Sequence, residues 1–377
     1  MVANIIIGSN YGDEGKGTVT ATCVKHSTGN TLNVLTNGGA QRAHSILTET
    51  GNFTFQHFGS GTYHGASSYF SKYFIINPMQ FAKEYNELEI KGIIPCAYRD
   101  SRCRWSTPFD MIANAIIEKL RKDNKHGSCG MGIWETVLRY KNTEYNKSFD
   151  EFMQMDESSK INYLQLIKNY FEINRISDGI PHEWEFIWNN VNIIMHFISD
   201  CEFMYENTIV CPLKEVIQNK IFKFNNIIFE NGQGLLLSDT GKDIAGTTPS
   251  LTGCDYAKEL IRETNIPMYI NIHYVTRSYL TRHGKGMLSN EMDKVSISSN
   301  IQEDRTNHYN IYQESFRYGC MTDEFIIKMH DYIIKDAEKI NNANIILDIT
   351  HCDEIDNISK FKKIFKNVIT YDSPIIK

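Results

Sequence analysis

The chain has 377 residues, 41% of them hydrophobic, with a formal net charge of -6 and a pI near 6.1. This length can bury a large core, while the acidic balance argues against a protein that binds nucleic acid through a general positive field. The nine cysteines form no CxxC pair or zinc-type spacing, and no apolar run reaches the ~20 residues that cross a bilayer. No cleavable signal sequence precedes the first strand-like run. We therefore expect a cytoplasmic protein with reduced thiols, no membrane contact and small-molecule partners.

The N-terminal part of the chain predicts a βαβ unit. The apolar runs 2–8 and 31–39 end abruptly in glycine, which indicates buried strands, and the segment between them has the length of a helix. Parallel strands joined in this way place the loop after the first strand at the carboxyl edge of the sheet, where such sheets bind ligands. Helical periodicity returns at 77–92 and again at 108–124.

The middle of the chain is different in character. From about 141 to 226 glycine nearly disappears and long amphipathic stretches dominate, which predicts a mostly helical insertion or cap. Strand-like runs reappear at 225–234, 268–280 and 343–353. Because sheet-forming segments span nearly the whole sequence, we expect one large α/β domain over 1–377, with a mainly parallel central sheet and flanking helices.

The loop that follows the first strand, GDEGKG at 12–17, combines glycines with charged residues. Glycines let successive backbone N–H groups turn toward one point, and the following helix N-terminus and Lys16 add positive charge, so the loop suits phosphate oxygens. The P-loop pattern GxxxxGK[ST] is not met, because Asn10 replaces its first glycine and Gly17 its hydroxyl residue. Glycines alone equally suit a tight turn. Asp13 and Glu14 beside a phosphate need a further reason, either magnesium or proton transfer.

A second polar cluster, TNGGAQRAHSI at 36–46, ends the next predicted strand. A parallel sheet would bring it beside the first loop. His44 in this cluster could donate a proton or hydrogen bond to an oxygen that gains charge, although a single histidine more often has a structural role.

Taken together, these clusters resemble the adenylosuccinate synthetase family, whose fold is related to that of P-loop NTPases. The first family signature appears as Tyr11 followed by GDEGKG, and the second, GGxNAGHT, is matched loosely by GGAQRAHS at 38–45. The resemblance continues in order through nearly the full length and is weakest at 141–226 and in the C-terminal tail. The other matching stretches are HFGSGTYHG at 57–65, INPMQFAKEYNELEIKGI at 76–93, KHGSCGMGIWETVLR at 125–139, FENGQGLLLSD at 229–239, RSYLTRHGKG at 277–286 and ITHCDEID at 349–356.

The resemblance implies a ligase that joins L-aspartate to C6 of a 6-oxopurine nucleotide. In this chemistry a nucleoside triphosphate first phosphorylates O6, and the aspartate amine then displaces the phosphate. By resemblance, Asp13 removes the N1 proton and contacts Mg2+, and His44 stabilises charge on the transferring phosphoryl group. Lys16 is the third catalytic residue. The triphosphate would lie against Gly12, Glu14, Gly15 and Gly17, with Asp353 accepting N1–H and N2–H of a guanine; Ala43 would be a second metal ligand.

The same resemblance implies the remaining sites. Arg317 would clamp the carboxylates of aspartate, with Arg282 and Lys285 as its neighbours. Arg139 would reach into the monophosphate site of a neighbouring subunit, which implies a functional homodimer; an arginine that ends a helix is also often a solvated surface residue. Asp353 after its strand could instead cap a helix. The residues implied for the monophosphate are Asn10, Gln41, Ser128, Cys129, Arg139, Gln233 and Thr247.

Departures from the family pattern favour one branch of it. They are Gln41 for asparagine, Arg42 for alanine, Ala43 for glycine, Cys129 for threonine, and His351 with Cys352 for lysine and leucine. Several of these surround the monophosphate, and the chain is shorter than the usual bacterial enzymes. This resembles the divergent phage branch, which acts on dGMP on the route to 2-aminoadenine and implies a host-cytoplasmic protein. The donor could be GTP, ATP or dATP. The alternatives are an enzyme that acts on IMP with GTP, a nucleotide-binding regulator without ligase activity, and a catalytically dead homologue.

Overall fold

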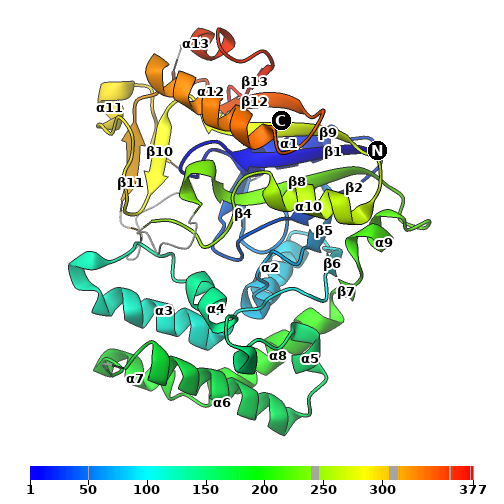
Figure 1. Cartoon of the computed structure of the whole chain (residues 1–377), viewed down its shortest axis with the longest axis vertical. Coiled ribbons are helices and arrows are strands. Elements are labelled where there is room, and N and C mark those ends of the chain that lie inside the picture. The colour runs from blue at the N-terminus through cyan, green and yellow to red at the C-terminus, as the bar shows by residue number, and fades with distance from the viewer. Residues whose placement is uncertain are drawn as a thin grey trace.

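The computed structural model describes residues 1–49, 51–177, 179–238, 246–304, 313, 315–355, 358–373 and 375–376. Asp239 and Asp356, the last residues of two of the stretches quoted above, lie outside these ranges. Figure 1 shows a central sheet with helices above and below it.

The central sheet has nine strands, and all of its neighbouring pairs are parallel. The predicted fold class, an α/β protein built on a mainly parallel sheet, is therefore confirmed. In sheet order the strands are β13 (Val368–Thr370), β12 (Asn344–Thr350), β9 (Tyr269–Arg277), β1 (Val2–Gly8), β8 (Phe224–Gly234), β2 (Asn30–Leu35), β5 (Ser67–Phe70), β6 (Ala97–Arg99) and β7 (Ile209–Val210).

The predicted βαβ unit is present, but its two strands are not neighbours. The helix α1 (Lys16–Lys25) follows β1 and leads to β2, as expected, yet β8 lies between them and pairs with both. The end of β8 therefore lies between the two strands that lead to the polar loops. This order follows from the apolar content of β8, whose Ile227, Ile228 and Phe229 are almost fully buried, as a central strand of a parallel sheet requires.

Two small sheets accompany the central one. The antiparallel pair β10 (Leu280–His283) and β11 (Phe316–Gly319) shows that the predicted strand 268–280 breaks after Arg277. The second small sheet holds β14 (Ile375–Ile376), β3 (His44–Thr48) and β4 (Gly51–Phe55).

The first helical layer begins with strong local signals. Asn77 caps α2 (Pro78–Ile90), and Thr107 with Asp110 forms a capping box at the start of α3 (Pro108–Leu120). Pro108 at the first helical position adds to this signal, because its missing N–H would have no partner there. The short α4 (Ile133–Arg139) follows α3 and contacts it.

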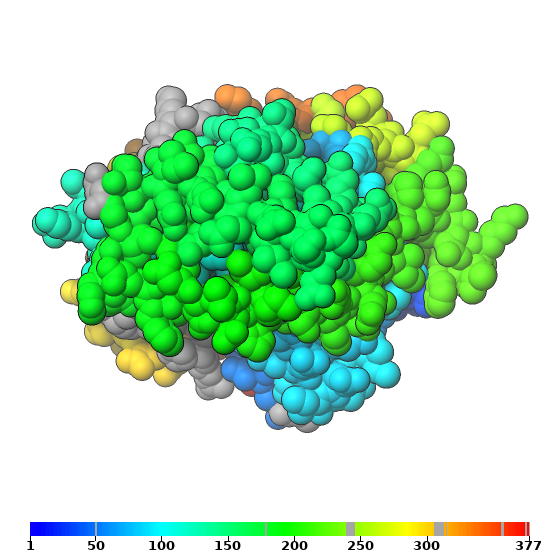
Figure 2. All heavy atoms as spheres, turned by 90° about the horizontal axis from the view of Figure 1, so that it is seen from below, coloured from blue at the N-terminus to red at the C-terminus, as the bar shows by residue number. Residues whose placement is uncertain are grey.

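The segment predicted as a helical insertion forms a layer under the sheet (Figures 1 and 2). It also returns to the sheet, because β7 pairs with β6 and β8 begins at Phe224. The treatment of 1–377 as one domain with an insertion at 141–226 remains a prediction. The helices within 141–226 are α5 (Phe149–Met153), α6 (Glu157–Asn174), α7 (His182–Trp188), α8 (Asn192–Glu206) and α9 (Leu213–Ile217).

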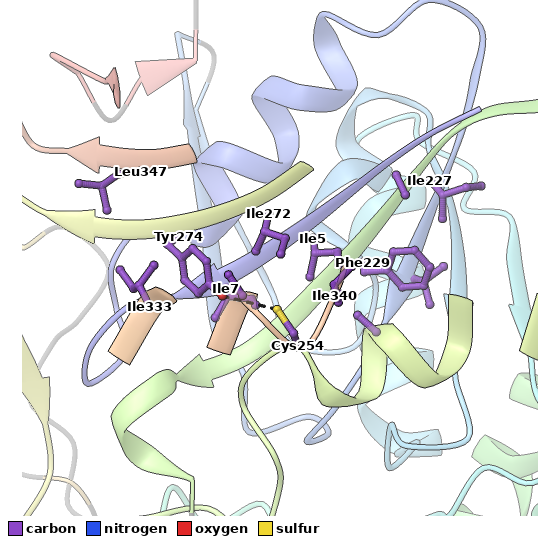
Figure 3. Close-up of a cluster of buried hydrophobic side chains, with 14 of the residues drawn as sticks. Ile5, Ile7, Ile227, Phe229, Cys254, Ile272, Tyr274, Ile333, Ile340 and Leu347 are labelled. Atoms are coloured by element: carbon purple, nitrogen blue, oxygen red, sulfur yellow. Dashed lines mark hydrogen bonds between the residues drawn. The ribbon is translucent and has the colours of Figure 1, made fainter. Parts of the chain in front are cut away.

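One face of the sheet is covered by helices that follow this segment in the chain, whereas α1 packs on the other face. On the first of these faces α10 (Asp255–Thr264) and α12 (Asp323–Ala337) pack on the strands (Figure 3), where Ile5, Phe229 and Ile272 meet Cys254 and Ile333 in one apolar cluster. Two short helices, α11 (Lys294–Ile297) and α13 (Ser359–Lys362), lie near the C-terminal part of the sheet. Among the described residues, no helix combines the length and the apolar character needed to span a membrane.

Candidate active site

The loop after β1 adopts a backbone that glycine favours. Gly12 and Gly15 have φ angles of 93° and 96°, and Asp13 between them has a φ of 59°. A non-glycine residue in this left-handed region is strained by about 1 kcal/mol or more, and such strain concentrates at functional sites. In this conformation the Asp13 side chain lines the cavity that the loop borders.

The second acid of the loop is used within the loop. Glu14 accepts the N–H groups of Asn10 and Gly12 through one carboxylate oxygen, both at 2.9 Å, and pairs with the Lys16 ammonium through the other, also at 2.9 Å. Glu14 and Lys16 are both almost fully buried. Glu14 therefore organises the turn, and the Gly12 N–H points to its carboxylate rather than to the cavity. Both acids line the cavity, and the Glu14 carboxylate is the one that the N–H groups of the turn engage.

The N-terminus of α1 supplies the donors that a phosphate needs. Its N-cap is Gly15, which has no side-chain cap, and no acidic residue lies in the first turn. The first N–H groups of a helix have no partner inside the helix, so here they point toward Gly15 and the cavity. Gly17 and Thr18 both line that cavity.

Asp13 lies in a cavity of about 420 Å³. Burial raises the pKa of Asp13, and this effect exceeds the opposing influence of Lys16, Arg277 and His283. Arg277 also donates from Nε to the Asp13 carbonyl oxygen at 2.7 Å, which holds the strained residue in place. A carboxylate that is partly withdrawn from water in this way is a stronger proton acceptor than a solvated one.

The second loop reaches the first through α1. His44 is the first residue of β3, and a Cβ placed on Gly17 would lie 2.8 Å from the Ser45 carbonyl oxygen and 3.1 Å from the His44 carbonyl carbon. Only a glycine fits between these backbones. Asp13 and His44 both line the same cavity, as the sequence predicted.

His44 sits in a buried charged network. Its Nδ1 lies 2.6 Å from Oε1 of Glu230, and Arg42 pairs with the same oxygen at 2.7 Å. Burial, with the Arg42 charge, lowers the pKa of His44 to about 3, although Glu230 opposes the change. Arg42 and the hydrogen bonds from His44 and Ser60 lower the pKa of Glu230 far enough to outweigh its burial. The network therefore holds a neutral imidazole beside an ionised carboxylate.

A bulge in β8 turns Gln233 toward the site. The register of β1 against β8 jumps from Ile6 opposite Glu230 to Gly8 opposite Gly234, so extra residues of β8 bow out of the ladder. Gln233 has a φ of 66° and lines the cavity. A Cβ on Gly234 would lie 2.4 Å from the Asn10 carbonyl oxygen, so this glycine lets β8 approach the first loop.

Most of the other predicted residues also line the cavity. Gln41 donates to the Thr248 hydroxyl at 3.3 Å, while its own Oε1 is buried without a partner among the described residues. Ser128 donates to Asn114 at 2.7 Å, and burial raises the pKa of Cys129 to about 11, which keeps that thiol neutral. The predicted residues in this group are Gln41, Ala43, Ser128, Cys129, Thr247 and Asp353.

The cavity residues are compatible with magnesium. The described residues contain no cluster of three or more His, Cys, Asp and Glu side chains suited to a metal. Mg2+ does not need one, because it is usually held by one or two carboxylates together with substrate phosphates and water. Asp13 offers a carboxylate and Ala43 a backbone carbonyl beside the same cavity.

Two predicted residues serve the protein interior instead. Asn10 is not a cavity residue, since its side chain donates to Thr276 and accepts from Tyr332. Arg139 is fully buried in its own chain, where it pairs with Asp110 at 2.9 Å and donates to the Trp105 and Tyr145 carbonyl groups. The expectation that Arg139 reaches a neighbouring subunit is therefore wrong. Every donor nitrogen of its guanidinium is used inside the helical layer.

The arginine expected to bind aspartate is engaged elsewhere. Arg317 forms a two-fold ion pair with Glu291, at 2.7 and 2.5 Å, and donates to the Gly284 and Gly286 carbonyl groups. It is not among the residues that line the cavity. Its neighbours Arg282 and Lys285 likewise donate to backbone carbonyl groups.

Three residues of the site had no role in the sequence interpretation: Arg42 and Arg277 line the cavity, and Glu230 lies buried beside His44. Arg277 and Glu230 end or nearly end a strand and lie within stretches that match the family, and this position was the available signal. Arg42 was noted only as a departure from the family pattern. It is 2% exposed, and its Nε and Nη1 have no partner among the described residues.

Comparisons with known proteins agree with this arrangement. A sequence model of the adenylosuccinate synthetase family matches residues 5–365. The adenylosuccinate synthetase of Synechocystis sp. (strain ATCC 27184 / PCC 6803 / Kazusa) is 25% identical over 299 residues, which cover 78% of this chain and 64% of that protein. The enzyme of that name from Clostridium perfringens is 24% identical over 306 residues, which cover 78% of this chain and 66% of its own. The chain thus spans about two-thirds of the length of these curated relatives.

Two solved structures share the fold. Fully ligated adenylosuccinate synthetase from Plasmodium falciparum has a TM-score of 0.68 at 16% identity, over 93% of this chain and 77% of that one. The succinoaminodeoxyadenylate synthetase of cyanophage S-2L, bound to dGMP and to dATP as an energy donor, has a TM-score of 0.63 at 11% identity, over 99% of this chain and 93% of that one. The extent of the family match shows that this chain belongs to the adenylosuccinate synthetase family.

Proposed function

We propose that this protein is a ligase that joins L-aspartate to C6 of a 6-oxopurine nucleotide at the expense of a nucleoside triphosphate. The observation that carries the proposal is one cavity lined together by Asp13, His44 and Gln233. Asp13 comes from the loop after β1, His44 from the start of β3 and Gln233 from the bulge of β8. A reaction that needs a base, a group facing the transferring phosphoryl and a purine contact needs such a convergence.

In this proposal the residues act in the order of the chemistry. Asp13 accepts the N1 proton of the purine, so that O6 gains the electron density to attack the γ-phosphorus of the triphosphate, whose bond to the bridging oxygen breaks to release the nucleoside diphosphate. The first turn of α1 and Lys16 hold the phosphate oxygens. His44 faces the phosphoryl group as it moves from the bridging oxygen of the triphosphate to O6 of the purine. The amine of aspartate then forms the C6–N bond, and O6 leaves with the phosphate. Gln233 orients the purine beside Asp13.

Magnesium would be held by Asp13, the Ala43 carbonyl group and the phosphates, and it would neutralise charge that builds up on the phosphate oxygens. The finer choice of donor rests on Asp353. This carboxylate is exposed at the cavity, where it could accept both N1–H and N2–H of a guanine, so we propose GTP ahead of ATP or dATP.

For the purine we propose dGMP ahead of IMP. Support comes from the departures around the monophosphate, such as Arg42 and Cys129, and from the likeness in fold to a phage enzyme solved with dGMP. The curated relatives are named adenylosuccinate synthetases, which keeps IMP with GTP as the alternative. We also propose a homodimer, without the contribution from Arg139. Arg317 would have to release Glu291 before it could bind a carboxylate of aspartate.

Phosphate release tests the proposal. The purified chain receives L-aspartate, Mg2+ and either GTP or ATP, with dGMP or IMP in separate reactions, and inorganic phosphate is followed with and without aspartate. We expect release that requires both aspartate and a monophosphate, and that is faster with dGMP. Absence of aspartate-dependent release with either monophosphate would overturn the ligase. Slow hydrolysis indifferent to aspartate would instead identify a nucleotide-binding regulator.

A further inference from the structure

Glu230 is the buried carboxylate closest to the proposed catalytic histidine. It is 0% exposed, and its Oε1 lies 2.6 Å from Nδ1 of His44. Ser60 donates twice to the same carboxylate, from its hydroxyl to Oε1 at 2.5 Å and from its backbone N–H to Oε2 at 3.0 Å. With Arg42 paired to Oε1 as well, the carboxylate receives donors on both oxygens. Such a set of donors stabilises the ionised form.

The short contact between Glu230 and His44 fixes the position of a proton. An ionised carboxylate only accepts hydrogen bonds, so an oxygen and a nitrogen at 2.6 Å need the proton on Nδ1. Arg42 also lies 2.9 Å from this nitrogen, but its Nη2 donates to Glu230 and cannot accept from the imidazole. In a neutral ring, this hydrogen on Nδ1 places the lone pair on Nε2.

The free ring nitrogen faces the cavity. Nε2 of His44 has no hydrogen-bond partner among the described residues, and it is absent from the buried atoms that lack one, so it remains accessible. The ring itself is nearly buried, at 7% exposure. A 180° rotation about the Cβ–Cγ bond would put Cδ2 in the place of Nδ1 and Cε1 in the place of Nε2, and the contact of Nδ1 with Glu230 opposes this rotation.

From this geometry we infer that Glu230 is a positioning residue for the proposed reaction: it holds the His44 ring by Nδ1–H and presents Nε2 to the phosphoryl group in transfer. This inference rests on the proposed function for the identity of the group that Nε2 meets. The same logic of a carboxylate that orients an imidazole and fixes its tautomer operates in hydrolases with a His-carboxylate pair. Glu230 comes from β8, so the strand inserted between β1 and β2 links the two loops.

The first test reads the tautomer directly. The protein is labelled with 15N-histidine, and the ring nitrogen shifts of His44 are assigned by their loss in His44→Gln. We expect a protonated Nδ1 and an unprotonated Nε2 in the unsubstituted protein at pH 7.5, and a mixture of tautomers in Glu230→Gln. A ring protonated at Nε2 alone in the unsubstituted protein would overturn the inference, whatever the enzyme does.

The second test separates positioning from folding. Glu230→Gln keeps the size of the side chain, and we expect kcat to fall about 100-fold, as for loss of acid–base assistance, with KM for the triphosphate changed less than about threefold. Ser60→Ala is the matched control, because it removes one donor to Glu230 and leaves the contact with His44. We expect its kcat within about fivefold of the parent.

A kcat for Glu230→Gln within threefold of the parent would also overturn the inference, as would a fall in Ser60→Ala as large as that in Glu230→Gln. Failure of the proposed function would give a different experimental result. The unsubstituted protein would then release no phosphate in response to aspartate, with the His44 tautomer unchanged.

Discussion

Two buried arginines, one in the helical layer and one at the cavity, differ in how many of their guanidinium nitrogens have hydrogen-bond partners. Arg139 in the helical layer uses all its nitrogens, with two bonds to Asp110 and one each to the Trp105 and Tyr145 carbonyl groups. Arg42 at the cavity pairs with Glu230 and leaves two nitrogens without a partner among the described residues.

This contrast extends to the surroundings of each residue. In the helical layer Arg99 also pairs twice with Asp150, which ties α5 to the central sheet. At the cavity, by contrast, Gln41 has a buried oxygen without a partner, and Asp13 keeps a strained backbone and a raised pKa. Buried charge that is fully satisfied is structural, whereas incompletely satisfied polar groups gather where a ligand completes them.

The largest expected effect is at Asp13. Asp13→Ala should lower kcat by ~10²–10⁴-fold, since general base assistance contributes that much. The stability of the protein should change little, because removal of a partly desolvated carboxylate also relieves its burial. Aspartate-dependent phosphate release measures the loss. Asp331→Ala, on an exposed part of α12, is the matched control and should keep the parental rate. A rate within tenfold of the parent for Asp13→Ala would remove its role as proton acceptor.

Arg139 tests the structural side of the comparison. Arg139→Met leaves Asp110 as a buried carboxylate without its cation, and we expect the free energy of unfolding to fall by about 3–5 kcal/mol in urea titrations. A second change, Asp110→Leu, should restore part of that loss by removing the unpaired charge. The folded fraction of Arg139→Met should keep its kcat. A stable variant that loses activity would return Arg139 to a functional role.

The contact between the two loops should respond to a single methyl group. In Gly17→Ala the added carbon would meet the Ser45 carbonyl oxygen at 2.8 Å, so the second loop must move. Because a displacement of about 1 Å can cost 10²-fold in rate, we expect kcat to fall by 10- to 100-fold. Gly92→Ala, where nothing lies within 4 Å of the new carbon but a φ of 77° strains the alanine, controls for the backbone cost of losing a glycine. Equal kcat values in the two variants would show that the contact between the two loops does not affect the reaction.

The smallest effect concerns Glu84, which lies between the two regions. This buried carboxyl accepts the N–H groups of Gln56, His57 and Phe58, and burial raises its pKa to about 7. The folded state therefore binds this proton more tightly than the unfolded state. The contribution of Glu84 to stability should be greatest below its usual pKa range and should fall as the pH rises toward 7.

The free energy of unfolding of the parent, minus that of Glu84→Gln, measures this contribution. It should decrease between pH 5 and pH 7.5 by an amount on the order of 1 kcal/mol. A difference that stays constant or increases would show that the three N–H groups, rather than burial, control the carboxyl.

Local patterns in the sequence predicted the elements and the first loop. Apolar β-branched runs predicted β1, β2, β8, β9 and β12, and helical periodicity predicted α2 and α3. The order of the strands could not be predicted, because the insertion of β8 between β1 and β2 depends on contacts between segments far apart in the chain. The bulge that turns Gln233 into the cavity is hidden for the same reason.

The roles of single charged residues were less predictable. Motif position assigned Arg139 to a subunit interface, but only the packing of Asp110 and Trp105 around it reveals that it is buried. Glu14 looked like a phosphate or metal residue, since nothing local shows that its carboxylate closes the turn on Asn10 and Gly12. The partners of a charge, which decide its function, come from the tertiary structure.

Transfer of the purine oxygen tests the central claim most directly. The protein is given L-aspartate, Mg2+, the triphosphate and dGMP or IMP labelled with 18O at O6, and the released inorganic phosphate is analysed by mass spectrometry. If O6 attacks the γ-phosphorus and leaves with it, each phosphate must carry one 18O from the purine. Phosphate without the label would mean that water cleaves the triphosphate, and would contradict the proposed cooperation of Asp13 and His44.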